Sequence, residues 1–120
     1  MATKRGSYVP KQGDLVWLSF DPQAGHEQAG RRPAVILSPG SYNAATQLAI
    51  CCPITSKVKG YPFEVEIPAG LAVGGVVLSD QLKSLDWSAR KVEFIASLPT
   101  RILLEILRKA SLLVAPDSAQ

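Results

Sequence analysis

Apolar residues in this chain gather in short runs that are separated by polar, glycine-rich and proline-rich segments, a pattern typical of short strands joined by turns. Strands are expected at residues 14–20, 33–38, 47–53, 63–67, 75–78, 81–85 and 91–95. The run at 33–38 is almost entirely apolar and is expected to be buried on both faces. The runs at 63–67 and 81–85 alternate, as half-exposed strands do. The pattern therefore predicts a mainly β fold of six or seven short strands, a small barrel.

A different periodicity begins at Pro99, a residue that favours the first turn of a helix. From there charged residues lie on one side of the expected helix, and apolar residues recur at helical spacing on the other: Ile102, Leu103, Ile106, Leu107, Ala110 and Leu113. This predicts a C-terminal amphipathic α-helix that packs on the sheet. Residues 41–46 are expected to form a turn or a short helix. We expect one domain over residues 1–120, with a polar arm at about 1–12 and a frayed tail at about 115–120.

Composition narrows the class of protein. Hydrophobic residues make up 47% of the chain and charged residues 19%, which excludes a disordered chain. Apolar runs are too short to span a membrane, and residues 1–11 lack the apolar stretch of a signal peptide, so a cytoplasmic protein is expected. The net charge of +3 suits an anionic partner but does not identify one.

Few catalytic chemistries are supported by the residue types present. The adjacent Cys51 and Cys52 point to opposite faces of their strand, so they are expected to be small apolar core residues rather than metal ligands. The chain has one histidine and no cluster with the spacing of metal ligands, so no metal and no cofactor are expected. Glycine motifs that bind phosphate and the signatures of serine hydrolases are also missing.

Two polar loops remain as candidate functional sites, at residues 25–32 and 55–60, each between apolar strands. They contain Arg32 and Thr55. A guanidinium beside a hydroxyl suits a phosphate, because the guanidinium donates two hydrogen bonds and the hydroxyl a third. On composition alone, solvated loop charges are the simpler explanation.

Longer motifs favour a functional site over solvated loop charges. Residues 13–22, 25–38, 52–56, 59–65 and 75–87 resemble, in that order, the MazF/PemK toxins of toxin–antitoxin pairs. The resemblance extends over about residues 8–114, nearly the whole chain. It implies an SH3-like β-barrel of the CcdB/PemK type with a C-terminal helix, and a homodimer.

The resemblance also implies a reaction. Members of this family are mRNA interferases that cut single-stranded RNA at specific sequences without a ribosome or a metal ion, and so stop translation and growth. The 2′-OH attacks the adjacent phosphate and leaves a 2′,3′-cyclic phosphate and a 5′-OH end. The family's catalytic arginine falls on Arg32 and its catalytic threonine on Thr55. Glu27, the carboxylate of the first loop, is expected to orient Arg32 or to assist proton transfer.

A wider set of residues is expected to contact RNA, with cations on phosphates and the other side chains on base edges: Gln28, Arg31, Lys57, Lys59, Asp80, Gln81 and Lys83. Arg31 precedes Arg32 and is a candidate to share its phosphate contact. Strand-end capping is the other role open to Asp80 and Gln81. Trp17 and Trp87 are candidates for base stacking, although packing in the core or a dimer is the expected role.

The resemblance implies a partner as well, a cognate MazE-type antitoxin that blocks the RNA site. An ACA-containing cleavage sequence is expected from the resemblance alone. Two other functions stay open. A gyrase poison of the CcdB type is disfavoured because residues 117–120 contain no aromatic residue. A non-catalytic SH3-like module would bind RNA or peptide without cutting it.

Overall fold

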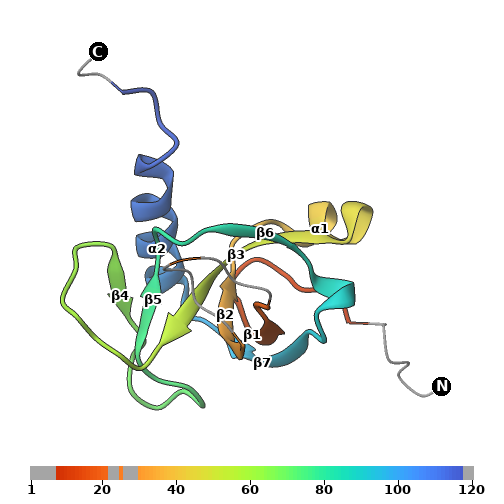
Figure 1. The fold of residues 1–120 in the computed structure, drawn as a ribbon, viewed down its shortest axis with the longest axis horizontal. Helices are drawn as coiled ribbons and strands as arrows, with labels where there is room; N and C mark the ends of the chain where they lie inside the picture. The colour runs from red at the N-terminus through yellow and green to blue at the C-terminus, as the bar shows by residue number, and fades with distance from the viewer. Residues whose placement is uncertain (1–7, 22–24, 26–29, 118–120) are drawn as a thin grey trace.

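The computed structural model describes residues 8–21, 25 and 30–117. Its elements follow one another as β1 (Asp14–Ser19), β2 (Arg31–Ile36), α1 (Gly40–Thr46), β3 (Leu48–Thr55), β4 (Glu64–Glu66), β5 (Val76–Leu78), β6 (Lys83–Asp86), the 3₁₀ turn η1 (Trp87–Ala89), β7 (Glu93–Ser97) and α2 (Thr100–Leu112). The predicted mainly β fold with a C-terminal helix is confirmed (Figure 1). Residues 41–46 form a short helix rather than a turn.

The strands form one antiparallel, seven-stranded sheet in which six follow the order β4-β5-β3-β2-β1-β7 and the seventh, β6, pairs with β3. Strand β3 is central and the longest, with 8 residues. One of its edges pairs with β2, while the other edge pairs with β6 over its first half and with β5 at its end. Within the described residues the outer strands β4 and β7 are not paired with each other, so the predicted barrel is not closed.

The register between β2 and β3 determines which residues meet at the ends of these two strands. Ala34 lies opposite Pro53, and Val35 lies opposite Cys52. If this register is continued toward the start of β2, Arg32 lies opposite Thr55 at the end of β3. Opposite residues of an antiparallel pair have Cβ atoms about 5 Å apart. The sheet therefore makes neighbours of two residues that are far apart in the chain.

Both faces of the sheet carry buried apolar residues. One face packs under α2, through the buried Ile102, Ile106 and Ala110. The other face packs under Trp87, whose indole N–H donates to the carbonyl oxygen of Asn43 at 3.1 Å. Cys51 belongs to one of these clusters and Cys52 to the other. This confirms that the two cysteines point to opposite faces, as alternation along a strand requires.

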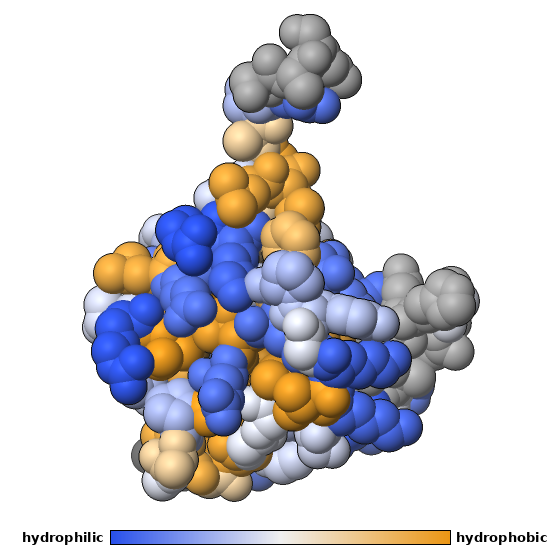
Figure 2. Space-filling view, turned by 90° about the vertical axis from the view of Figure 1, so that its left-hand side faces the viewer, coloured by the Kyte–Doolittle hydropathy of each residue, from blue (hydrophilic) through white to orange (hydrophobic). Residues whose placement is uncertain are grey.

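The end of α2 projects beyond the sheet (Figures 1 and 2). The prediction that Leu113 packs with the buried stripe is wrong, because Leu113 follows the last helical residue and is 47% exposed. Its neighbours Leu112 and Val114 are exposed too. None of the described helices has the length and apolar character that a membrane crossing demands.

Candidate active site

The Arg32 guanidinium and the Thr55 hydroxyl lie at the ends of neighbouring strands. Arg32 donates from Nη1 to the carbonyl oxygen of Ile54 at 3.4 Å, which directs its guanidinium toward the end of β3. Thr55 is buried, and its Oγ1 accepts the backbone N–H of Lys57 at 3.1 Å. A hydroxyl that accepts one hydrogen bond can still donate its own proton. The pair thus presents a fork of cationic donors and a fixed hydroxyl donor.

This pair lines a cavity of about 550 Å³. That volume is within the range of small-molecule and cofactor sites, roughly 300–1,000 Å³. The cavity brings together a subset of the predicted site residues, from the start of β2, the end of β3 with its following loop, and the turn after β5: Arg32, Thr55, Lys57, Lys59, Asp80 and Gln81. The wall holds three cations and two carboxylates, Asp80 and Glu64, and this excess of positive charge suits an anionic ligand such as a nucleic acid.

The wall also includes Ser56, from the candidate loop at residues 55–60, and three residues that were not predicted: Tyr61, Glu64 and Leu78. Tyr61 and Glu64 lie inside the motif at residues 59–65, which carried the resemblance, so the signal was present in the sequence. Glu64 shapes the wall directly. Its carboxylate accepts the backbone N–H of Lys59 at 3.1 Å and that of Gly60 at 2.9 Å.

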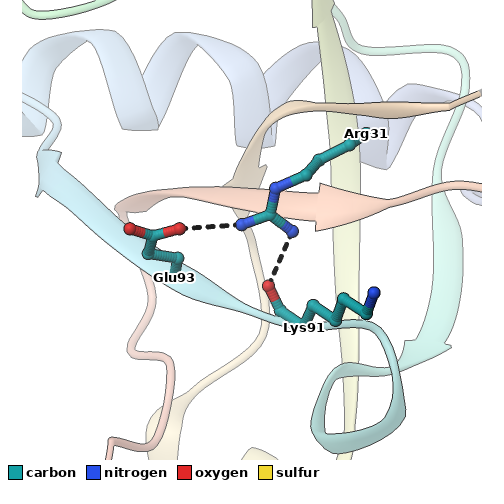
Figure 3. A network of polar contacts seen from close by, with 3 residues as sticks. All are labelled: Arg31, Lys91 and Glu93. Atoms are coloured by element: carbon teal, nitrogen blue, oxygen red, sulfur yellow. Dashed lines mark hydrogen bonds and ion pairs between the residues drawn. The ribbon is translucent and has the colours of Figure 1, made fainter.

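Arg31 lies outside this cavity. Its Nη1 donates to the carbonyl oxygen of Lys91 and its Nη2 to Oε1 of Glu93, both at 2.8 Å (Figure 3). With Arg90 and Lys91 it lines a separate hollow of about 420 Å³. Arg31 and Arg32 diverge because adjacent residues of a strand project to opposite faces. The structure therefore does not bring Arg31 to the phosphate site that we expect at Arg32.

The remaining predicted residues divide into two groups. Glu27 and Gln28 lie outside the described residues. Lys83 opens β6 opposite Cys51 and is not part of the cavity wall. Of the two tryptophans, Trp87 is buried and has the predicted packing role, while Trp17 is half-buried on β1.

The two cysteines have no thiolate character at neutral pH. Burial raises the pKa of both thiols, each to about 12. Two neutral, buried thiols agree with the predicted role of small apolar core residues.

Comparison with known proteins decides the family. A model described as the PemK-like, MazF-like toxin of type II toxin–antitoxin systems matches residues 11–114, which include every residue of the cavity wall. The chain belongs to this PemK/MazF family.

Individual relatives agree with this assignment. Endoribonuclease toxin MazF of Escherichia coli strain K12 is 55% identical over 83 residues, which are 69% of this chain and 74% of that protein. The crystal structure of MazF from Deinococcus radiodurans superposes with a TM-score of 0.87 at 56% identity, over 89% of this chain and 97% of that one. A MazE–MazF complex from the same organism gives 0.81 at 56% identity, over 89% and 96% of the respective chains.

Proposed function

We propose that this PemK/MazF family member is an endoribonuclease toxin that cuts single-stranded mRNA at specific sequences, without a ribosome or a metal ion. The observation that carries the proposal is the meeting of Arg32 and Thr55 on the wall of a cation-lined cavity. Relatives named as endoribonucleases support it.

In the proposed reaction the ribose 2′-OH attacks the neighbouring phosphorus. The 2′-oxygen loses its proton and forms the new P–O bond, while the P–O5′ bond breaks and O5′ gains a proton. The products are a 2′,3′-cyclic phosphate and a 5′-OH end. Negative charge gathers on the non-bridging oxygens, where the Arg32 guanidinium and the Thr55 hydroxyl donate. Removing one such donor typically costs about 10²- to 10³-fold in kcat. Glu27 orients Arg32 or assists the proton transfer.

The rest of the cavity wall suits a single strand of RNA. Lys57 and Lys59 supply positive charge for phosphates beside the one that is cut. Asp80 and Gln81 offer groups that read base edges, which are accessible in single strands but hidden in the deep groove of duplex RNA. The geometry adds no support for Gln28, Arg31 and Lys83, which lie off the cavity or outside the described residues.

We propose that the toxin acts in the cytoplasm as a homodimer and is neutralised by a MazE-type antitoxin. The MazE–MazF complexes of the Deinococcus radiodurans relative support the antitoxin. Exposed apolar side chains at the end of α2 support an interface with a second copy.

One gel tests the proposed function. Purified protein is incubated with a long single-stranded RNA in EDTA, beside Arg32→Ala and Thr55→Ala. Arg31→Ala is the matched control, because it removes the neighbouring arginine that lies off the cavity. We expect discrete fragments with 5′-OH ends from the wild type and the control, and intact RNA from the other two. Intact RNA in every lane would contradict cleavage, and a supercoiling assay would then separate a gyrase poison from a binding module.

A further inference from the structure

An exposed aromatic side chain stands at the rim of the cavity. Tyr61 is 60% exposed and lines the cavity together with Lys59. An aromatic side chain in water forgoes the stabilisation that burial gives to a large apolar side chain. A single exposed apolar residue is common on protein surfaces and is not evidence by itself. The second observation is how firmly the backbone of Tyr61 is held.

The main chain on both sides of Tyr61 is fixed by hydrogen bonds. Its own carbonyl oxygen accepts the N–H of Glu64 at 3.1 Å, which closes a turn with Pro62 at the second position. Before it, the N–H of Gly60 donates to the Glu64 carboxylate at 2.9 Å. After it, the carbonyl oxygen of Pro62 accepts from Nζ of Lys109 on α2 at 2.6 Å. The loop thus ties Tyr61 to both the sheet and the helix.

A ring presented from a fixed backbone loses little conformational entropy when it binds a ligand. The charge around it narrows the choice of ligand. The cations of the wall outnumber its carboxylates, three against two, and Lys57 and Lys59 are among them. A ligand with negative charge next to a flat, apolar surface fits this wall. Unpaired nucleobases between phosphates have this combination, and proteins that bind single strands stack such bases on aromatic side chains.

We propose that Tyr61 is the platform on which one base of the RNA stacks, beside the phosphate that is cut. This inference rests on the proposed function and adds a binding residue to it. Stacking tolerates any base, because every base has a π-face, so Tyr61 contributes to affinity more than to sequence choice. Among the described residues that line the cavity, Tyr61 is the one with an aromatic side chain. Trp87 is buried elsewhere, and Tyr42 and Phe94 are exposed away from the cavity.

The test compares Tyr61→Leu, which removes the ring, with Tyr61→Phe, which removes the hydroxyl. Tyr42→Leu is the matched control, an exposed tyrosine on α1. The probe is a short RNA with a cleavage site mapped on the wild type and a 2′-deoxyribose in place of the attacking nucleotide. Fluorescence anisotropy measures Kd. We expect Kd to rise at least about fivefold for Tyr61→Leu and to stay within about twofold for Tyr61→Phe. Tyr42→Leu is expected to match the wild type.

A second measurement separates stacking from a structural effect of the substitution. RNAs with a single abasic site are scanned through the positions around the cut. One position is expected to lose affinity for the wild type but not for Tyr61→Leu, and on cleavable RNA that variant is expected to raise KM more than it lowers kcat.

Three results would overturn the proposal. They are unchanged affinity of Tyr61→Leu, an equal loss with Tyr61→Phe, or the same abasic profile for wild type and Tyr61→Leu. If the wild type cuts no RNA, the proposed function itself fails, and this inference fails with it.

Discussion

Gly75 lies against the backbone of Thr55, and its lack of a side chain is a structural requirement. A Cβ atom built on Gly75 would be 2.2 Å from the carbonyl oxygen of Thr55, and the φ angle of Gly75 is +109°. Both the clash and the left-handed backbone disfavour any other residue.

Gly75→Ala is therefore expected to lower the free energy of unfolding by about 2 kcal/mol or more, and to slow RNA cleavage by displacing Thr55. Urea unfolding and single-turnover cleavage measure the two effects. Gly74→Ala is the control, since a Cβ there meets nothing within 4 Å. Equal stability of the two variants would contradict the role given to Gly75.

The cysteines give a prediction about pH. Burial raises the pKa of Cys51 and of Cys52 to about 12, against about 8.5 in an unfolded chain. Both thiols are thus expected to resist an aromatic disulfide reagent at pH 8 in the folded protein and to react at once in urea. Between these pKa values the unfolded state binds fewer protons than the folded state, so stability is expected to fall as the pH rises above about 8.5. Replacing both cysteines with alanine should reduce the fall in the free energy of unfolding above about pH 8.5. Rapid labelling of the folded wild type would show that the thiols are accessible.

That Arg32 and Thr55 lie at one cavity was predictable from the motifs around them, and their catalytic role stays a prediction. The position of Arg31 was not predictable. The apolar pattern begins the second strand at Pro33, which leaves both arginines in a loop, where the alternation of a strand does not apply. In the structure β2 begins at Arg31, so the two side chains are separated by the sheet. The missing information was the strand boundary, which here depends on pairing with β1 rather than on local hydrophobicity.

At the scale of elements, one carboxylate holds the middle of the segment from Ser56 to Phe63. Glu64 accepts the backbone N–H groups of Lys59 and Gly60, which places Lys59 on the cavity wall. Glu64→Ala is expected to remove these acceptors and speed the hydrogen exchange of both amides. It is also expected to weaken RNA binding about fivefold, as the loss of one exposed hydrogen bond of about 1 kcal/mol would do.

Glu64→Gln keeps an acceptor oxygen and is expected to restore much of the protection. Glu66→Ala is the control, an exposed carboxylate on the same strand. Amide exchange followed by NMR at Lys59 and Gly60 decides between them. Unchanged exchange in Glu64→Ala would show that the loop is held by other contacts, such as the bond from Lys109.

The same scale shows what periodicity can and cannot predict. Apolar and alternating runs located every strand within a few residues, and the helical pattern located α2, because each pattern reports which face of an element is buried. For α1 the sequence left a turn and a short helix open. The patterns do not report partners. Contacts between distant segments decide which strands pair. They give one edge of β3 to both β5 and β6, and they leave the outer strands β4 and β7 unpaired with each other in the described residues. The exposure of the projecting end of α2 was not predicted for a related reason. Its apolar residues continue the helical pattern, but no part of the described chain packs on them.

At the scale of the whole molecule, that projecting end carries three consecutive aliphatic side chains that no other part of the described chain covers. Leu112, Leu113 and Val114 are 60%, 47% and 80% exposed, and apolar side chains gather on this projection in Figure 2. Contiguous exposed apolar surface is typical of protein–protein interfaces.

If a second copy covers this surface in the proposed homodimer, the double variant Leu113→Asp, Val114→Asp should leave a folded monomer, because charged residues are costly in the centre of an interface. Light scattering after size exclusion measures the mass, and circular dichroism checks the fold. Val58→Asp is the control, an apolar residue that is 63% exposed on the loop before β4. A wild type that is monomeric at high concentration would contradict the homodimer. A double variant that stays dimeric would instead locate the interface on another face, and the exposed end of α2 would then be the first surface to examine for the antitoxin.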